Sequence, residues 1–227
     1  MKPVIIIPAF NPPESFKTLI DRINNIISIP IIVVDDGSNS FININYDYIT
    51  LLRNRHNKGK GYSLIKAFKY AYKKGYTHSI TLDADSQHDP RYLCNFLEIN
   101  EEIPIVIGKR NFNKRMPIHR KLSNIITSRI ISYICGQTIH DSQCGYRRYK
   151  LSEVCSENYI ENGFQFESEV LIKLLGISNC SIYQINIPTI YDSEKSYINN
   201  LMDAVKFLRL IVRSISTTSL NILLGHL

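Results

Sequence analysis

The first half of the chain alternates short β-branched runs with amphipathic segments, and this alternation limits the folds that are open to it. Runs such as Val4–Ile7 and Ile31–Val34 have the length and branching of buried strands. Alternating strands and helices build parallel βαβ units, so the sequence predicts an α/β fold: a doubly wound, mostly parallel sheet with helices on both faces. The expected strands are Val4–Ile7, Ile31–Val34, Ile49–Leu52, Ser79–Leu82 and Ile103–Ile107, and the expected helices are Glu14–Ile29, Gly61–Lys74 and one that begins at Pro90.

The second half contains two long amphipathic segments, Ile118–Ile134 and Tyr197–Leu224. In each, apolar residues recur in steps of three and four, which predicts a helix with one apolar side. The first stripe is formed by Ile118, Leu122, Ile125, Ile126, Ile130, Tyr133 and Ile134, and the second by Leu201, Val205, Leu208, Val212 and Ile215. Between these helices we expect a loop at Asp141–Arg148, a helix at Gln165–Leu175 and extended chain at Ser181–Ile190.

The composition favours one globular domain in a reducing compartment. A length of 227 residues suits a single sizeable core. The five cysteines are an odd number without a C-x-x-C pair, which argues against a disulfide framework or a zinc ribbon. The first apolar run is too short for a signal peptide, and no stretch reaches the apolar length of a transmembrane helix. We therefore expect a cytoplasmic protein.

The positive charge is concentrated in one segment. The chain has 27 Lys and Arg against 20 Asp and Glu, a net charge of +7. Seven of these bases, and no acid, lie between Ile103 and His140. A concentrated positive field attracts the phosphates of nucleotides, lipid headgroups or nucleic acids, although a solvated basic face has the same composition. Few aromatic residues are interleaved with these bases, so nucleic acid is not an expected partner.

Polar side chains follow four of the expected strands at the points where these strands end. They lie in the segments Pro8–Asn11, Asp35–Ser38, Asp83–Asp85 and Gly108–Arg110. Ligands of doubly wound sheets bind beyond the carboxyl ends of the strands. The sequence therefore predicts one crevice with acids on two strand ends and bases on another.

The Asp83-Ala84-Asp85 triplet is the strongest single motif. Two carboxylates at one strand end repel each other unless a cation or a hydroxyl-rich ligand lies beside them. Oxygen donors without a nearby His or Cys set indicate Mg²⁺ or Mn²⁺ and not zinc, while an Asp-rich turn is the alternative. The chain has no P-loop, no dinucleotide-binding glycine fingerprint and no EF-hand loop.

The order of these motifs resembles that of family 2 glycosyltransferases, in the branch of dolichyl-phosphate mannosyltransferase and bacterial polyprenyl-phosphate sugar transferases. The resemblance covers nearly the whole chain. It implies a GT-A-type fold with a transferase domain at 1–196, divided into a nucleotide-binding half at 1–110 and an acceptor half at 111–196, followed by a basic amphipathic helix at 197–227. The motifs that carry it are Pro8–Asn11, Asp35–Ser38, Asn57–Gly61, Asp83–His88, Gly108–Arg110, Arg120–Ser123, Asp141–Arg147, Phe166–Glu169 and Ile187–Tyr191 with Ser196.

The resemblance also implies roles for individual residues. It implies that a nucleotide-sugar donor is bound by Pro8, Phe10, Val34, Asp36, Asp83, Ala84 and Ser196. It implies that Asp85 and Gln87 are the ligands of a Mg²⁺ or Mn²⁺ cofactor, and that the catalytic residues are Asp85, Arg110 and Arg120. The two arginines match basic residues that face the donor diphosphate and the acceptor phosphate.

The implied reaction is metal-dependent, inverting transfer of a sugar to polyprenyl (dolichyl or undecaprenyl) phosphate. Transfer to a saccharide hydroxyl is the alternative, and it would need a general base such as Asp141, Glu167 or Glu169. Pro12-Pro13 stands where the family often has Glu, so the nucleotide and the acceptor stay open.

Two further classes compete with a glycosyltransferase. A haloacid-dehalogenase-like phosphatase would use Asp83 as nucleophile, although that motif usually lies nearer the N-terminus. A non-catalytic domain that keeps the fold is the other.

The basic amphipathic helices have two interpretations. In one, both helices pack their apolar sides on the sheet. In the other they rest on an anionic membrane surface, which would make the protein peripheral on the inner face of the membrane.

Overall fold

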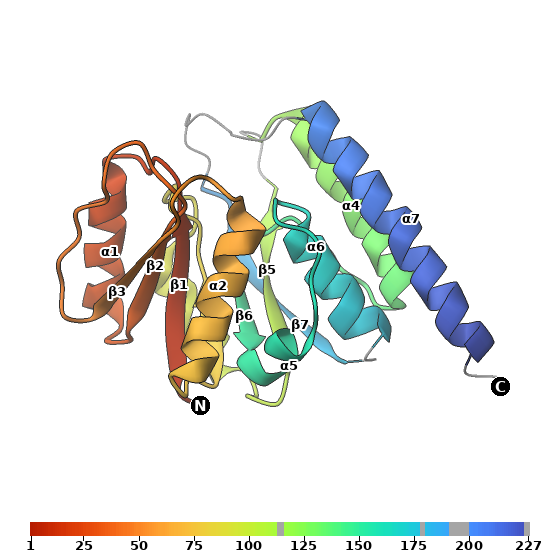
Figure 1. The fold of residues 1–227 in the computed structure, drawn as a ribbon, viewed down its shortest axis with the longest axis horizontal. Helices are drawn as coiled ribbons and strands as arrows, with labels where there is room; N and C mark the ends of the chain where they lie inside the picture. The colour runs from red at the N-terminus through yellow and green to blue at the C-terminus, as the bar shows by residue number, and fades with distance from the viewer. Residues whose placement is uncertain (113–115, 178–179, 191–199, 225–227) are drawn as a thin grey trace.

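A seven-stranded sheet forms the centre of the computed structural model, which describes residues 1–112, 116–177, 180–190 and 200–224 (Figure 1). The strand order is β3-β2-β1-β4-β6-β5-β7. The strands are β1 (Pro3–Ala9), β2 (Ile31–Asp35), β3 (Ile49–Arg53), β4 (His78–Thr81), β5 (Ile105–Asn111), β6 (Arg147–Lys150) and β7 (Ile182–Pro188). All neighbouring pairs are parallel except those that include β6. The predicted mostly parallel sheet is therefore confirmed.

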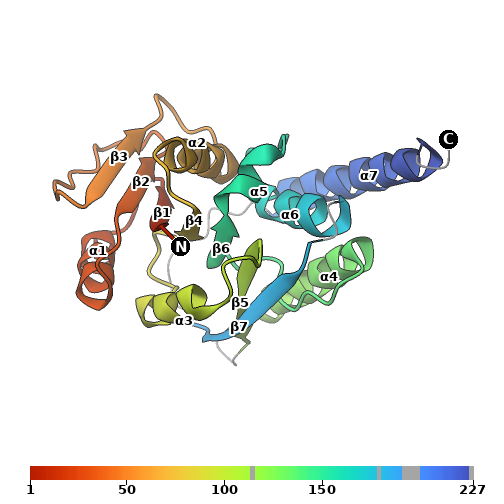
Figure 2. The same cartoon turned by 90° about the horizontal axis from the view of Figure 1, so that it is seen from below.

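Helices cover both faces of the sheet. They are α1 (Ser15–Ile26), α2 (Lys60–Lys73), α3 (Leu93–Glu98), α4 (Ile118–Cys135), α5 (Leu151–Ser156), α6 (Phe166–Leu171) and α7 (Asn200–Leu224). A 3-10 turn at Pro90–Tyr92 leads into α3, and α6 continues as a π-helical segment at Ile172–Ile177. Figure 2 shows α1 and α3 on one face, and α2, α5 and α6 on the other.

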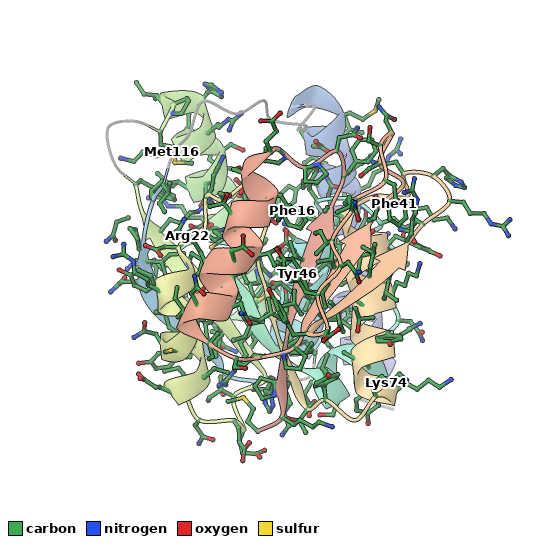
Figure 3. The ribbon with its side chains drawn as sticks, turned by 90° about the vertical axis from the view of Figure 1, so that its left-hand side faces the viewer. Phe16, Arg22, Phe41, Tyr46, Lys74 and Met116 are labelled. Carbon is green, nitrogen blue, oxygen red and sulfur yellow. The ribbon has the colours of Figure 1, made fainter. Side chains whose placement is uncertain are left out.

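The core forms where both faces of a strand are covered. In β1 and β2 the β-branched residues of Val4–Ile7 and Ile31–Val34 are almost fully buried. On α1 the residues at helical spacing, among them Phe16 and Ile20, supply the layer above them. The long connection between β2 and β3 is tied to the same helix, because the Tyr46 hydroxyl donates a hydrogen bond to Asp21 at 3.0 Å (Figure 3).

The predicted loop at Asp141–Arg148 is wrong at its end, where the chain enters β6. This strand lies between β4 and β5 and is antiparallel to both. Its two arginines gave the segment a surface-like composition, but both are fully buried. Their guanidinium groups donate to main-chain carbonyls, Arg147 to those of Ser142, Cys144 and Glu167, and Arg148 to those of Phe96, Ile99 and Asn100. Buried charges of this kind are tolerated because most of their N–H groups find an acceptor, although Arg148 Nε has none.

Among the described residues, no helix is both long enough and apolar enough to cross a bilayer.

Candidate active site

The carboxyl ends of β1, β2, β4 and β5 lie at one edge of the sheet, the upper edge in Figure 1. Because β1 pairs with β2 on one side and with β4 on the other, Asp36 and Asp83 follow the two strands that flank the end of β1. The acids of the predicted crevice therefore lie on the two sides of the end of β1, which carries Pro8 and leads to Phe10.

The loop after β1 is locked to the turn after β2. The main-chain N–H of Asn11 donates to Ser38 Oγ at 2.9 Å, and the Asn39 N–H donates to Asn11 Oδ1 at 2.9 Å. Asn11 has a φ of 45°, a left-handed conformation that Asn tolerates better than most residues. Pro8 and Phe10 are half-buried beside this lock, whereas the Val34 side chain is fully buried.

The Asp36 carboxylate holds the loop that leads into α2. Its Oδ1 accepts hydrogen bonds from Asn54 Nδ2 at 2.7 Å and from the Lys58 N–H at 3.0 Å, and its Oδ2 accepts from the Gly59 N–H at 2.8 Å. Gly59 has a φ of 100°, and a Cβ there would lie 2.3 Å from the Asn162 carbonyl oxygen. Asp36 thus fixes the glycine-rich segment Asn57–Gly61, which is not a P-loop.

Asp83 forms a half-buried ion pair that the sequence alone did not predict. Lys60 Nζ lies 2.5 Å from Asp83 Oδ1 and 3.2 Å from Glu167 Oε2, and so it joins the end of β4 to α6. A Cβ at Gly145 would approach Asp83 Oδ2 to 2.6 Å, which explains a glycine at this position. Burial alone would raise the pKa of Asp83, but the charge of Lys60 outweighs it and holds that pKa at about 2.

His88 holds the main chain at Asp83. Its Nδ1 accepts the Asp83 main-chain N–H at 3.2 Å, and its ring packs on Tyr146 with centroids 5.2 Å apart. Burial lowers the pKa of His88 to about 4, although the nearby Asp83 charge acts in the opposite direction. The imidazole is therefore neutral near pH 7.

Asp85 and Gln87 share one turn. Asp85 Oδ1 accepts the Gln87 main-chain N–H at 3.0 Å, and Ser86 between them has a φ of 61°. No three His, Cys, Asp or Glu side chains gather as a metal cage in the part of the chain that the structure describes. A carboxylate and an amide carbonyl are nevertheless suitable ligands for Mg²⁺, which proteins usually hold by one or two carboxylates together with substrate phosphates. These residues fit the predicted cofactor.

On the other side of the crevice, Arg110 forms a two-pronged ion pair with Asp141. The Arg110 Nε donates to Asp141 Oδ2 at 2.7 Å, and its Nη2 donates to Oδ1 at 2.9 Å. Asn124 on α4 donates to the same carboxylate at 2.6 Å. Burial alone would raise the pKa of Asp141, but Arg110 and Asn124 hold it below its ordinary value. Arg120 is half-buried on α4, one helical turn before Asn124. The helix thus carries one predicted catalytic arginine and, through Asn124, contacts Asp141, the partner of the other one, Arg110.

Of the predicted site residues, Ser196 lies outside the described residues. Ala84 is half-buried between the two acids of its motif and packs on the core. The residues that sequence reasoning left unassigned are Lys60 and His88. Lys60 is 23 positions before Asp83, and only the parallel pairing of β1 with β4 and the placing of α2 bring them together. No local sequence signal could have found this pair.

Comparison with known proteins places the chain in a family of enzymes. The family model described as glycosyl transferase family 2 matches residues 4–155, and the chain belongs to this family. It is a glycosyltransferase, so the phosphatase and non-catalytic alternatives are not supported.

Two relatives share much of their length with this chain. The UDP-N-acetylglucosamine--dolichyl-phosphate N-acetylglucosaminyltransferase of Methanococcus voltae is 30% identical over 214 residues, which cover 82% of this chain and 85% of the relative. The polyprenol monophosphomannose synthase of Mycolicibacterium smegmatis is 25% identical over 193 residues, which cover 71% of this chain and 73% of the relative.

Among solved structures, the fold is similar to glucosyl-3-phosphoglycerate synthase of Mycobacterium tuberculosis in complex with Mn²⁺, UDP and glucosyl-3-phosphoglycerate. The TM-score is 0.69 at 15% identity, and the match covers 96% of this chain and 79% of that one. At this identity the likeness concerns the fold alone, and it confirms the predicted α/β fold of GT-A type.

The buried neutral His88 predicts a pH dependence of stability. The unfolded chain binds a proton at an ordinary His pKa of 6.5, whereas the folded chain binds it only near pH 4. Between these values the unfolded state holds more protons, so the free energy of unfolding falls as the pH falls, by up to about 3 kcal/mol. Urea unfolding of wild type and His88→Gln at pH 7, 6, 5 and 4 measures this slope.

We expect His88→Gln to lose most of the decline between pH 6.5 and pH 4. His119→Gln, which changes an exposed histidine on α4, is the matched control and should retain the decline. A His88→Gln variant with the wild-type slope would contradict the assignment.

Proposed function

We propose that this glycosyltransferase moves a sugar from a nucleotide-sugar donor to a polyprenyl phosphate, either dolichyl or undecaprenyl phosphate, with the help of a divalent metal ion. The acceptor class is supported by the names of the two relatives described above. A hydroxyl acceptor needs a general base and a phosphate acceptor does not, so the state of the acidic residues is a second, independent support for the acceptor class.

The observation that carries the proposal is the surroundings of Asp141, Glu167 and Glu169. One of these carboxylates would have to act as general base for a hydroxyl acceptor. Asp141 is paired with Arg110. Glu169 accepts the main-chain N–H groups of residues 160 and 161 and lies 3.2 Å from the Arg213 guanidinium. Glu167 lies 3.2 Å from Lys60 Nζ. All three carboxylates are thus engaged by protein groups, and Arg110 also lowers the pKa of Asp141, which weakens it as a base. A phosphate monoester is already ionised near neutral pH and needs no base.

The donor half of the crevice is proposed to hold the nucleotide between the strand ends of β1 and β2. Pro8 at the end of β1 and Phe10 after it would line this half, and Val34 would contribute main chain only, since its side chain is buried. Asp36 uses three hydrogen bonds to shape the loop that leads into α2, and any contact with the ribose adds to that role. Asp83 and Ala84 would contact the donor sugar and diphosphate, and Ser196 keeps its predicted role in binding the donor.

Charge explains how the leaving group is stabilised. A Mg²⁺ or Mn²⁺ ion held by Asp85 and Gln87 would supply positive charge to the departing nucleoside diphosphate. Arg110 is fixed by Asp141 and adds a preorganised positive charge at the same edge of the sheet. Arg120, in the first turn of α4, is proposed to receive the acceptor phosphate.

We further propose that the displacement occurs in one step with inversion at the anomeric carbon. An acceptor phosphate placed by Arg120 would approach from the side opposite the diphosphate, so that the bond to the acceptor forms as the bond to the diphosphate breaks. The halves 1–110 and 111–196 serve donor and acceptor in this proposal. Because the acceptor is a lipid, the protein is proposed to act at the cytoplasmic face of a membrane.

The direct test is a transfer assay with the purified chain, a panel of labelled nucleotide sugars and a short-chain polyprenyl phosphate in detergent with Mn²⁺. We expect an organic-extractable glycolipid from at least one donor, and none after chelation of the metal. The matching polyprenol, which lacks the phosphate, is the control and should give no product. Transfer to the polyprenol or to a saccharide instead would identify a hydroxyl acceptor, and Glu167→Gln would then be the variant to test as base.

The metal assignment predicts that Asp85→Asn lowers kcat about a hundredfold or more, because one charged ligand of the leaving-group cation is lost. The Mn²⁺ concentration for half-maximal activity should rise as well, which a purely structural defect would not cause. Asp47→Asn, at an exposed position before β3, is the control and should change neither quantity. Wild-type metal dependence in Asp85→Asn would exclude Asp85 as a ligand.

The acceptor assignment predicts that Arg120→Met raises the KM for polyprenyl phosphate by about tenfold to a hundredfold, since a charge-assisted hydrogen bond to phosphate is lost. The KM for the nucleotide sugar should stay within twofold of wild type. Arg129→Met removes an exposed charge from the same helix and serves as control. A rise in the donor KM alone would place Arg120 on the donor side.

A further inference from the structure

Helix α4 buries only part of its apolar residues, among them Ile131 and Cys135. Four of its large apolar side chains face outward and are 48 to 90% exposed, namely Ile118, Leu122, Ile126 and Tyr133. Its fully buried residues include two polar ones, Asn124 and Ser128. Of the two interpretations of this helix, packing of its apolar side on the sheet therefore does not hold for these four residues.

Hydrogen bonds explain why the polar residues of α4 face inward. Asn124 donates to Asp141, and the Ser128 hydroxyl contacts Ser142 Oγ at 3.0 Å and accepts the Ser142 main-chain N–H at 2.9 Å. The loop after α4, which carries the partner of Arg110, is positioned by these contacts. The inward face is thus committed to the active site, which leaves the apolar stripe on the surface.

Helix α7 presents a second stripe of the same kind. Leu210 is buried, with Phe207 and Ile211 packed beside it, while the residues of the opposite face are 41 to 65% exposed. These exposed residues are Met202, Val205, Leu208 and Val212. An apolar stripe on one helix is ordinary, but two neighbouring stripes are typical of a surface that contacts another apolar phase or protein.

The two helices lie at the same end of the molecule. α4 and α7 flank α6, and both begin near the edge of the sheet where β1, β2, β4 and β5 end (Figures 1 and 2). α6 is fixed to α7 by the hydrogen bond from Gln165 to Asp203 at 3.0 Å and by the Arg213–Glu169 ion pair. We call the exposed apolar residues of these two helices the α4–α7 surface, and its first residues on α4 bracket Arg120.

The charge of the α4–α7 surface identifies its partner. Exposed bases lie among the apolar residues, namely Lys121 and Arg129 on α4 and Lys206 and Arg209 on α7. The sequence of α4 has no Asp or Glu, and the single acid of α7, Asp203, accepts a hydrogen bond from Gln165. A second copy of the chain would bring these bases against each other, whereas an anionic bilayer offers both acyl chains and negative headgroups.

We propose that the α4–α7 surface docks on an anionic lipid bilayer, with its apolar side chains among the lipid tails and its bases on the headgroups. The inference rests on the proposed function in one respect only: the use of docking, which would bring the start of α4 to a membrane that contains the lipid acceptor. Docking itself is a property of the described side chains and is measurable without any substrate.

The test is flotation of the full chain with vesicles of phosphatidylcholine, either pure or containing phosphatidylglycerol. We expect the wild type to float with the anionic vesicles and to bind the pure phosphatidylcholine vesicles at least tenfold more weakly. The double variant Leu122→Glu/Leu208→Glu should lower the partition coefficient for anionic vesicles about a hundredfold. Each of these leucines, once covered by lipid, contributes at least about a factor of ten to binding.

The matched control is Tyr72→Glu/Tyr183→Glu, which adds the same charge at two exposed apolar positions on α2 and β7. This control should bind vesicles within threefold of wild type. All four substituted side chains are substantially exposed, so both variants should unfold at the wild-type temperature, and thermal unfolding verifies this. Equal loss of binding in both double variants would show that only net charge matters, and it would overturn the inference.

Two further outcomes would also overturn it: no flotation of wild type with anionic vesicles, or a wild-type dimer in sedimentation that Leu122→Glu/Leu208→Glu dissociates. The second outcome would assign the surface to a copy of the chain. Transfer to a short-chain acceptor in detergent separates this inference from the proposed function. Absence of transfer in wild type and variant alike would reject the function and leave the vesicle result standing, while unchanged transfer with unchanged vesicle binding would reject only the docking surface.

Discussion

Three carboxylates at the polar edge of the sheet are each paired with a cation from a different element. Asp83 is paired with Lys60 of α2, Asp141 with Arg110 of β5, and Asp35 with Arg53 of β3, at 2.5, 2.7 and 3.0 Å. Without these partners, parallel pairing would concentrate negative charge at one edge, and the repulsion would oppose folding. The ion pairs therefore allow these acids to lie at one edge of the sheet.

The same compensation determines the chemistry that the crevice can perform. The charges of Lys60 and Arg110 lower the pKa of Asp83 and of Asp141, so these two acids stay ionised and are better suited to hold a ligand than to accept a proton from it. In the proposed function, Arg110, Arg120 and a metal ion at Asp85 and Gln87 would face substrates that are themselves anionic. A site of that composition would stabilise a departing diphosphate and tolerate an incoming phosphate through preorganised charge.

How much the sequence could predict depends on the range of the interactions. The four parallel strands at the start of the sheet and the convergence of their polar ends follow from β-branched runs and turn residues, which are local signals. The sequence did not predict β6 because its two arginines are buried and donate to main-chain carbonyls of α3, α6 and the loop after α3. No local sequence pattern indicates such acceptors. Lys60 was missed for the same reason, since its partners Asp83 and Glu167 come from distant parts of the chain.

α4 shows where periodicity misleads. Its apolar spacing predicts a helix correctly, yet the face that packs inward is chosen by Asn124 and Ser128, whose hydrogen bonds to the loop after α4 would be lost in any other rotation. Burying two polar side chains while exposing apolar ones is unfavourable for a protein surrounded by water alone. The cost is offset if the outer face is covered by lipid. The helix would then join the two requirements of a lipid glycosyltransferase, because its inner face orients Asp141 and Arg110 while its outer face holds the crevice at the membrane.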